Sequence, residues 1–117
     1  MAHYEDLTID KGTDLSIDVF LVTTTGAAKN LTGYSVAGKL APSHYSDSAD
    51  KISFTASVAS PSTDGVVNLS LTNLQTDALN PKKRYVYDVE ISHVDSDANT
   101  LIERVLEGYI TVTPSVT

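Results

Sequence analysis

Alternation of apolar and polar residues with a period of two runs through most of this chain, and it limits the possible folds more than any other feature of the sequence. The clearest case is residues 14–24, where Leu15, Ile17 and Val19 alternate with polar or charged neighbours. This pattern is typical of a β-strand with one face in the core and the other in water. No such segment has the 3.6-residue period of an amphipathic helix. The sequence therefore predicts an all-β protein.

Further segments repeat this alternation and extend the prediction over the rest of the chain. Their apolar positions are Tyr34, Val36, Gly38 and Leu40; Ile52, Phe54, Ala56 and Val58; Val67, Leu69 and Leu71; Tyr85, Tyr87, Val89 and Ile91; and Leu106, Gly108, Ile110 and Val112. Residues 101–105 are expected to form a separate strand before the last set. From these sets we predict one core that contains Leu15, Ile17, Val19, Leu69, Leu71, Val89, Ile91 and Ile110.

Turn-forming residues separate the expected strands at Thr25-Gly26, residues 60–65, Asn80-Pro81 and residues 95–99. One short helical turn is expected within residues 73–79, capped by Thr72 or Asn73. Short strands with polar turns and no long helices between them are typical of a sandwich rather than a βαβ fold. We expect an Ig-like antiparallel β-sandwich of about seven to eight strands, formed as a single domain by residues 1–117.

Charge and length exclude several classes of partner. The 117 residues include 15 acidic and 8 basic ones, which gives a net charge of −7. That sign disfavours binding to nucleic acid and to anionic membrane surfaces. No apolar run approaches the roughly 20 residues that span a bilayer, and residues 1–10 do not read as a secretion signal. The absence of cysteine excludes disulfides and thiol nucleophiles.

Metal-binding and catalytic patterns are weak in this sequence. The three histidines, His3, His44 and His93, are far apart, and closed metal sites need three or four ligands. Asp95 begins a D-x-D-x-N run like that of a calcium-binding loop, but Thr100 stands at the sixth position and Leu106 at the twelfth, where glycine and glutamate are required. We interpret residues 95–99 as a polar hairpin turn. We expect neither an enzyme nor a bound cofactor or metal.

Several segments in a fixed order resemble a family of small phage structural proteins. They are TIDKGTD at 8–14, NLTGY at 30–34, DGVVNLSLT at 64–72, RYVYDVE at 84–90, LEG at 106–108 and VTP at 112–114. The chain is similar over nearly its entire length to the N-terminal domain of siphophage upper baseplate proteins and to short structural proteins of tailed cyanobacterial phages. It departs from the family at residues 81–83, where a Pro-Lys-Lys run replaces the glycine that often precedes the Arg-Tyr pair.

The resemblance implies an Ig-like sandwich built into a virion. We expect a tail, baseplate or fibre-attachment module that binds other virion proteins, with association between copies of the chain left open. The alternatives are a capsid decoration protein on the head surface and, in a different class, a carbohydrate-binding module. The absence of tryptophan speaks against the last alternative, because sugar sites usually present exposed aromatic faces.

Tyrosines and histidines outside the clear strands are the candidate partner-binding residues. Tyr34, Tyr85, Tyr87 and Tyr109 lie within expected strands, and we expect them in the core or at its rim. An aromatic ring in a polar segment has no core to fill and is suited to an interface. The candidates are His3 and Tyr4 in the arm formed by residues 2–6, and His44 and Tyr45 in the loop formed by residues 42–50.

Overall fold

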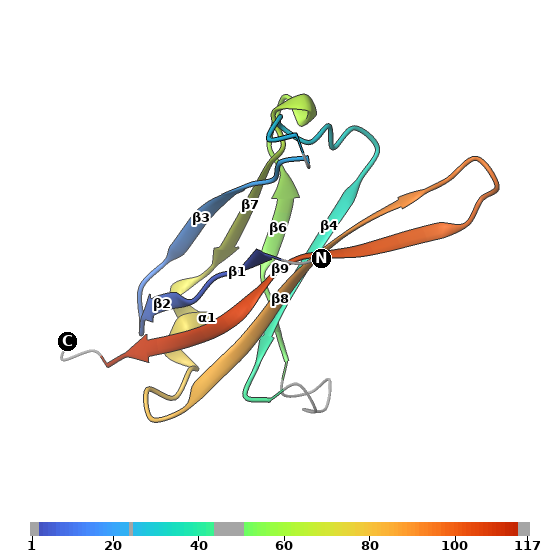
Figure 1. Ribbon diagram of the computed structural model, residues 1–117. Coiled ribbons are helices and arrows are strands. Elements are labelled where there is room, and N and C mark those ends of the chain that lie inside the picture. Colours follow the sequence, from blue (N-terminus) through green and yellow to red (C-terminus); the bar gives the residue numbers. More distant parts are fainter. Residues whose placement is uncertain (1–2, 24, 44–50, 115–117) are drawn as a thin grey trace.

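Two β-sheets enclose a single apolar core (Figure 1). The computed structural model describes residues 3–23, 25–43 and 51–114. The described part is elongated, with principal extents of 49, 27 and 22 Å. No helix among these residues is long and apolar enough to cross a membrane. The all-β sandwich expected from the alternation is confirmed.

The larger sheet has six strands within the described residues, in the order β1-β9-β8-β4-β5, with β2 also paired to β9. Their bounds are β1 (His3–Tyr4), β2 (Leu7–Asp10), β4 (Ser35–Ala41), β5 (Ile52–Ser53), β8 (Arg84–Val94) and β9 (Thr100–Thr113). Strands β5, β4, β8 and β9 pair antiparallel with one another, whereas β1 and β2 lie parallel to β9. The parallel pairs place the N-terminal segment against the C-terminal strand.

The smaller sheet consists of β3 (Leu15–Phe20), β7 (Val66–Leu71) and β6 (Thr55–Val58), with β7 in the middle. Between β5 and β6 the chain passes from one sheet to the other at Phe54. The Phe54 amide donates to the Gly38 carbonyl at 2.9 Å, and its buried ring packs edge-on to Tyr87 at 6.4 Å between centroids. Phe54 therefore joins the two sheets at this end.

Two short helices lie among the described residues: η2 (Ser62–Asp64) and α1 (Asn73–Asp77). Thr72 caps α1 in a capping box with Gln75, which confirms the expected helical turn and selects Thr72 as its cap. The buried Thr76 hydroxyl donates to the Thr13 carbonyl at 2.7 Å and accepts from the Gly12 amide at 3.1 Å. These bonds fasten α1 to the loop between β2 and β3.

Five of the eight predicted core residues are buried to 3% exposure or less: Leu69, Leu71, Val89, Ile91 and Ile110. Leu15, Ile17 and Val19 are only half-buried, although they pack against the core. Strand β3 lies at an edge of the smaller sheet and has β7 on one side only, so its side chains have fewer neighbours. The prediction that they point into the core is confirmed, and their burial is shallower than that of the other five.

Strand β9 corrects another expectation, because residues 101–105 and 106–112 form one strand instead of two. A register shift lies within the pairing to β8: Val89 pairs with Leu106, whereas Glu90 pairs with Arg104. Val105 is the extra residue of this β-bulge, and Val105 and Leu106 are both buried. The bulge shifts the alternation by one residue, which made one strand look like two.

Candidate interaction surfaces

The N-terminal arm (residues 2–6), described from His3 onward, lies along β9, as does β2 after it. His3 and Tyr4 form β1, pairing with Leu106 and Glu107. The prediction that they lie outside any strand was therefore wrong. A two-residue strand shows no alternation of its own, and it forms here because β9 offers a free edge. His44 and Tyr45 lie outside the described residues.

A hydrogen bond from the core holds this arm in place. The Tyr87 hydroxyl donates to the Glu5 carbonyl at 2.5 Å, and Tyr87 is only 2% exposed. Burial raises the pKa of the Tyr87 phenol, and the nearby Glu5 and Asp6 carboxylates raise it further. Gly108 makes room for the arm, because a Cβ atom at this position would overlap the Glu5 carbonyl oxygen. The arm is thus fixed at the point where β1 gives way to β2.

Tyr4 is 54% exposed, and its ring meets that of Tyr109 edge-on at 6.2 Å between centroids. Tyr109 is itself 41% exposed on the outer face of the larger sheet, whereas we expected it in the core or at its rim. The Arg84 guanidinium lies 5.3 Å from the centroid of the Tyr109 ring. We call Tyr4, Tyr109 and Arg84 the tyrosine–arginine patch. Lys82 and Lys83, both exposed, precede Arg84 in the adjoining turn.

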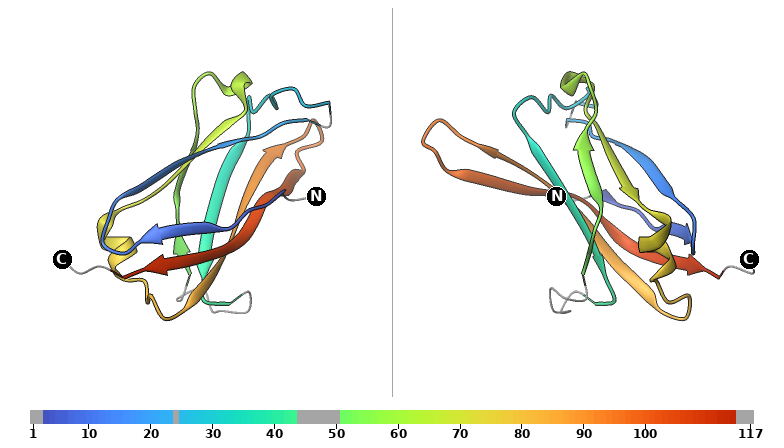
Figure 2. Two further views of the ribbon diagram at one scale, coloured as in Figure 1. Left: turned by 60° about the vertical axis from the view of Figure 1, so that its left-hand side comes forward. Right: turned by 180° about the vertical axis from the view of Figure 1, so that it is seen from behind.

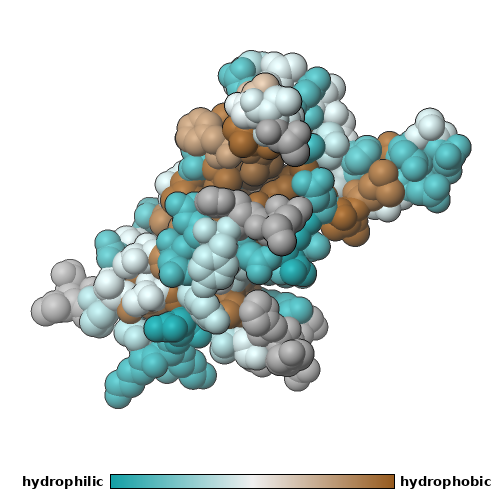
Figure 3. Space-filling model, in the orientation of Figure 1, coloured by the Kyte–Doolittle hydropathy of each residue, from teal (hydrophilic) through white to brown (hydrophobic). Residues whose placement is uncertain are grey.

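The other end of β8 forms a projecting ribbon, which we call the β8–β9 hairpin and define as residues 93–104. Strand β4 accompanies β8 as far as Ser92, and β1 accompanies β9 from Leu106 onward. Figure 1 and the right-hand view of Figure 2 show the ribbon projecting from the sandwich. Its apolar residues are exposed: Val94 by 63%, Leu101 by 47% and Ile102 by 65%. Brown surface on this ribbon is visible in Figure 3.

The tip of the hairpin is a tight turn organised by Asp95. One oxygen of its carboxylate accepts the backbone amides of Asp97 and Asn99, each at 2.9 Å. Ala98 takes a left-handed conformation with φ of 64°. The carboxylate oxygen therefore accepts hydrogen bonds from the backbone, as expected for a polar turn. Among the described residues there is no group of three or more histidine, cysteine or acidic side chains that could hold a metal ion.

His93, which was not expected to bind a metal, packs against Tyr34 at the base of the hairpin. The two ring centroids are 4.5 Å apart, with an angle of 42° between the planes. The Lys29 ammonium lies 5.5 Å from the centroid of the same tyrosine ring. This stack ties the inner side of the hairpin to the end of the sandwich.

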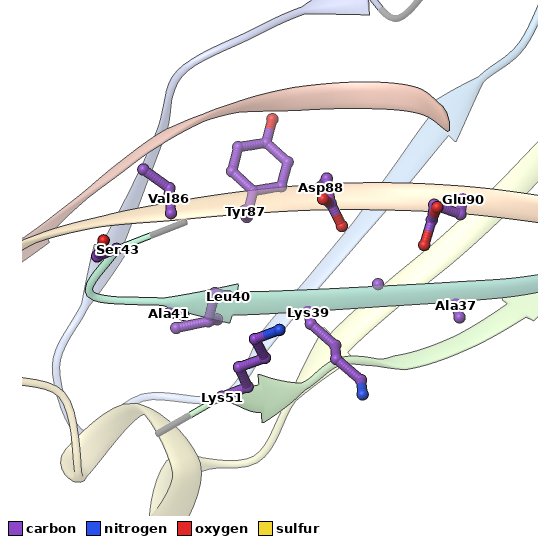
Figure 4. A pocket seen from close by; sticks show the side chains of 11 residues that line it. Ala37, Lys39, Leu40, Ala41, Ser43, Lys51, Val86, Tyr87, Asp88 and Glu90 are labelled. Carbon is purple, nitrogen blue, oxygen red and sulfur yellow. The ribbon is translucent and has the colours of Figure 1, made fainter. Parts of the chain in front are cut away.

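A shallow hollow of about 250 Å³ lies on the outer face of the larger sheet, between β4 and β8 (Figure 4). Charged side chains of both signs line it: Lys39, Lys51, Asp88 and Glu90. Tyr87 also borders it, but its hydroxyl is bonded to Glu5. The hollow is thus a polar depression, and the described residues that line it contribute no exposed aromatic face.

Comparison with known proteins identifies the fold. One solved structure that matches is that of murine CRIg, with a TM-score of 0.52 and 20% sequence identity. The match covers 93% of this chain and 92% of the other. No protein-family model and no curated protein matches the chain. The expected Ig-like β-sandwich is confirmed, and at this level of identity the likeness concerns the fold alone.

Proposed function

We propose that this Ig-like domain is a structural module of a phage particle, built into the tail or baseplate and binding other virion proteins. The ordered motifs from residues 8–14 to 112–114 support the assignment to a virion, since they resemble small phage structural proteins. The β8–β9 hairpin carries the proposal that the domain acts by binding. It holds Val94, Leu101 and Ile102 in water beyond the sandwich, and exposed apolar residues gathered in this way mark interaction sites.

The tyrosine–arginine patch is the second surface suited to a protein partner. Tyrosine and arginine are enriched at the centres of interfaces because each combines a broad apolar surface with a polar end. Tyr4, proposed from the sequence as a partner-binding residue, belongs to this patch. His3 lies beside it in β1. Tyr45 and His44 remain proposed partner-binding residues of the loop at 42–50.

Mass spectrometry of purified particles tests the assignment to the virion. We expect the chain in the particle at small multiples of three or six copies, as the symmetry of a tail requires. Hundreds of copies per particle would instead favour the alternative of a capsid decoration protein. Absence from the particles would refute both.

Incorporation of variants tests the use of the patch. Tyr4→Ala should leave the domain folded and lower its incorporation, because truncating an interface anchor weakens binding by about 2 kcal/mol or more. Phe20→Ala is the matched control: Phe20 is 72% exposed, but it lies on the smaller sheet. Equal incorporation of both variants would place the contact elsewhere.

The carbohydrate-binding alternative has less support from the surface. The hollow between β4 and β8 is polar, but among the described residues that line it the one aromatic ring, that of Tyr87, belongs to the core. Sugars usually stack on exposed aromatic faces. A glycan array tests this directly, and binding that is lost in Glu90→Ala would move the proposal to this hollow.

A further inference from the structure

The β8–β9 hairpin leaves apolar side chains uncovered on a ribbon that has little support of its own. Ile102 pairs with Ser92 and Thr100 pairs with Val94, so Ile102 and Val94 lie on the same side of the ribbon. Two-stranded ribbons are marginally stable in water without further packing. A protein surface laid on this side would both bury the two side chains and support the ribbon.

Charge limits what that surface can be. The tip of the hairpin carries Asp95 and Asp97, and the one cation within residues 93–104, Arg104, lies 3.5 Å from Asp88. Asp97 has an exposed side chain at the tip. The complementary surface must therefore combine apolar area with positive charge.

The tyrosine–arginine patch of this same chain has that combination. Tyr4 and Tyr109 present partly exposed rings, Arg84 lies over one of them, and Lys82 and Lys83 flank it. Patch and hairpin lie at opposite ends of β8, which has 11 residues and so is roughly 35 Å long. A hairpin therefore cannot reach the patch of its own chain.

Both surfaces lie on the outer face of the larger sheet. Tyr85 and Ile110 are buried on the inner face, which turns Arg84 and Tyr109 outward. Arg104 reaches Asp88 on the outer face, and Ile102, two residues before it, points the same way. Two copies placed face to face and antiparallel would bring each hairpin onto the other's patch. Such reciprocal two-fold pairing is the commonest way in which identical chains associate.

We propose that the partner of the hairpin is a second copy of this chain, and that two copies form a reciprocal dimer in which the β8–β9 hairpin of each covers the tyrosine–arginine patch of the other. This contact deepens the proposed function by naming one partner. It does not depend on where in a virion the domain sits. Its test uses the purified chain alone, so that its failure and the failure of the proposed function are separate results.

Sedimentation velocity of the full chain over a range of concentrations gives the first readout. We expect a monomer–dimer equilibrium. Ile102→Lys should weaken the dimer about tenfold or more, since it removes an apolar contact and places a cation against a cationic patch. Tyr109→Ser should weaken it to a similar degree. Phe20→Ser, on the other sheet, should leave it unchanged.

Mixing the two weakened variants separates this arrangement from others. Ile102→Lys retains an intact patch and Tyr109→Ser retains an intact hairpin, so the mixed dimer keeps one good contact while each variant alone has none. We therefore expect the mixture to dimerise better than either variant by itself. If Ile102→Lys does not fold by circular dichroism, Asp97→Lys takes its place, because Asp97 lies in the turn and its side chain is exposed.

Three results would overturn the proposal. One is a wild-type chain that stays monomeric at every concentration. Another is a ladder of larger species, which would mean open association instead of a closed pair. The last is a mixture that associates no better than its components, which would mean that hairpin and patch do not meet.

Discussion

The sandwich body and the β8–β9 hairpin are made from the same two strands, yet they are stabilised in different ways. In the body, β8 and β9 contribute Tyr87, Val89 and Ile110 to a core in which each is 2% exposed or less. In the hairpin, the same strands expose Val94 and Ile102 by 63% and 65%. Packing of apolar side chains stabilises the body. Backbone pairing between the two strands and the turn at Asp95 stabilise the hairpin. This contrast is the basis for our proposal that the apolar residues of the hairpin serve contacts outside the chain.

Substitutions at two isoleucines of β9 should show the largest contrast between these regions. Ile110→Ala removes a fully buried side chain from the body and should lower the free energy of unfolding by about 4 kcal/mol. Ile102→Ala, on the same strand but in the hairpin, should change it by no more than about 0.5 kcal/mol. Urea denaturation at a concentration where the chain is monomeric measures both. Similar losses at the two positions would erase the distinction.

A substitution where the arm meets β9 should have the next largest effect on stability. Gly108→Ala places a carbon on the Glu5 carbonyl and should lower the free energy of unfolding by about 2 to 3 kcal/mol, with faster hydrogen exchange at the amides of Glu5 and Tyr109. Gly33→Ala is the contrasting variant, since its added carbon meets nothing within 4 Å. Its φ of 81° should cost about 1 kcal/mol without affecting the arm.

Removing one hydroxyl tests how strongly the arm is fastened to the body. Tyr87→Phe deletes the donor to the Glu5 carbonyl and should lower the free energy of unfolding by about 1 kcal/mol at neutral pH. The raised pKa of Tyr87 means that the folded state keeps the proton more tightly than the unfolded state does. The stability that the protonated Tyr87 hydroxyl contributes is complete below about pH 10, the pKa of tyrosine in the unfolded chain, and it is lost at higher pH. Wild type should therefore lose more stability than Tyr87→Phe above pH 10, and parallel pH curves would contradict this.

The turn should produce a smaller and strictly local effect. Asp95→Ala leaves the amides of Asp97 and Asn99 without their acceptor and should cost about 1 kcal/mol or less, with faster hydrogen exchange in the hairpin but not in β4 or β7. Asp97→Ala should change neither the stability nor the exchange measurably. If Asp95→Ala increased exchange throughout the body, the two regions would unfold as one unit.

Calcium comes last in this order, because it should not change the melting temperature at all. Asp95 directs one carboxylate oxygen to backbone amides instead of leaving it for a metal ion. An ion that binds only the folded state raises the melting temperature by mass action. We expect the same melting temperature with and without millimolar calcium. A rise that disappears in Asp95→Ala would mean that the turn is a metal site after all.

The body could be predicted from the sequence because burial there imposes a period of two. In β7 and in the body part of β8, buried positions alternate with less buried ones, and the buried positions were identified correctly from the sequence. Burial in β3 is shallower than in β7, which the sequence could not predict because alternation shows which way a side chain points and not how many neighbours it has. Leu15 shows the same pattern as Leu69 but lies at the edge of its sheet.

The candidate surfaces were harder to predict because they depend on contacts between distant segments. Tyr4 was proposed from its place in a polar arm, but its partner Tyr109 is 105 positions later and was expected in or beside the core. One signal could have placed it: Tyr109 stands between Gly108 and Ile110, at a position that the alternation turns outward. Nothing in the sequence indicated that β8 extends beyond β4 or that β9 extends beyond β1. The length of the projecting ribbon depends on where β4 and β1 end.

The bulge at Val105 has a consequence for how such a chain can evolve. It stands just before the point where the hairpin joins the body, and it takes up the change in register between Leu106 and Arg104. An extra residue on the β9 side alone is thus accommodated at this point, and the pairs on the body side, such as Val89 with Leu106, keep their register. The same scaffold can acquire a longer or shorter ribbon, with new residues at its tip, while its core is inherited intact.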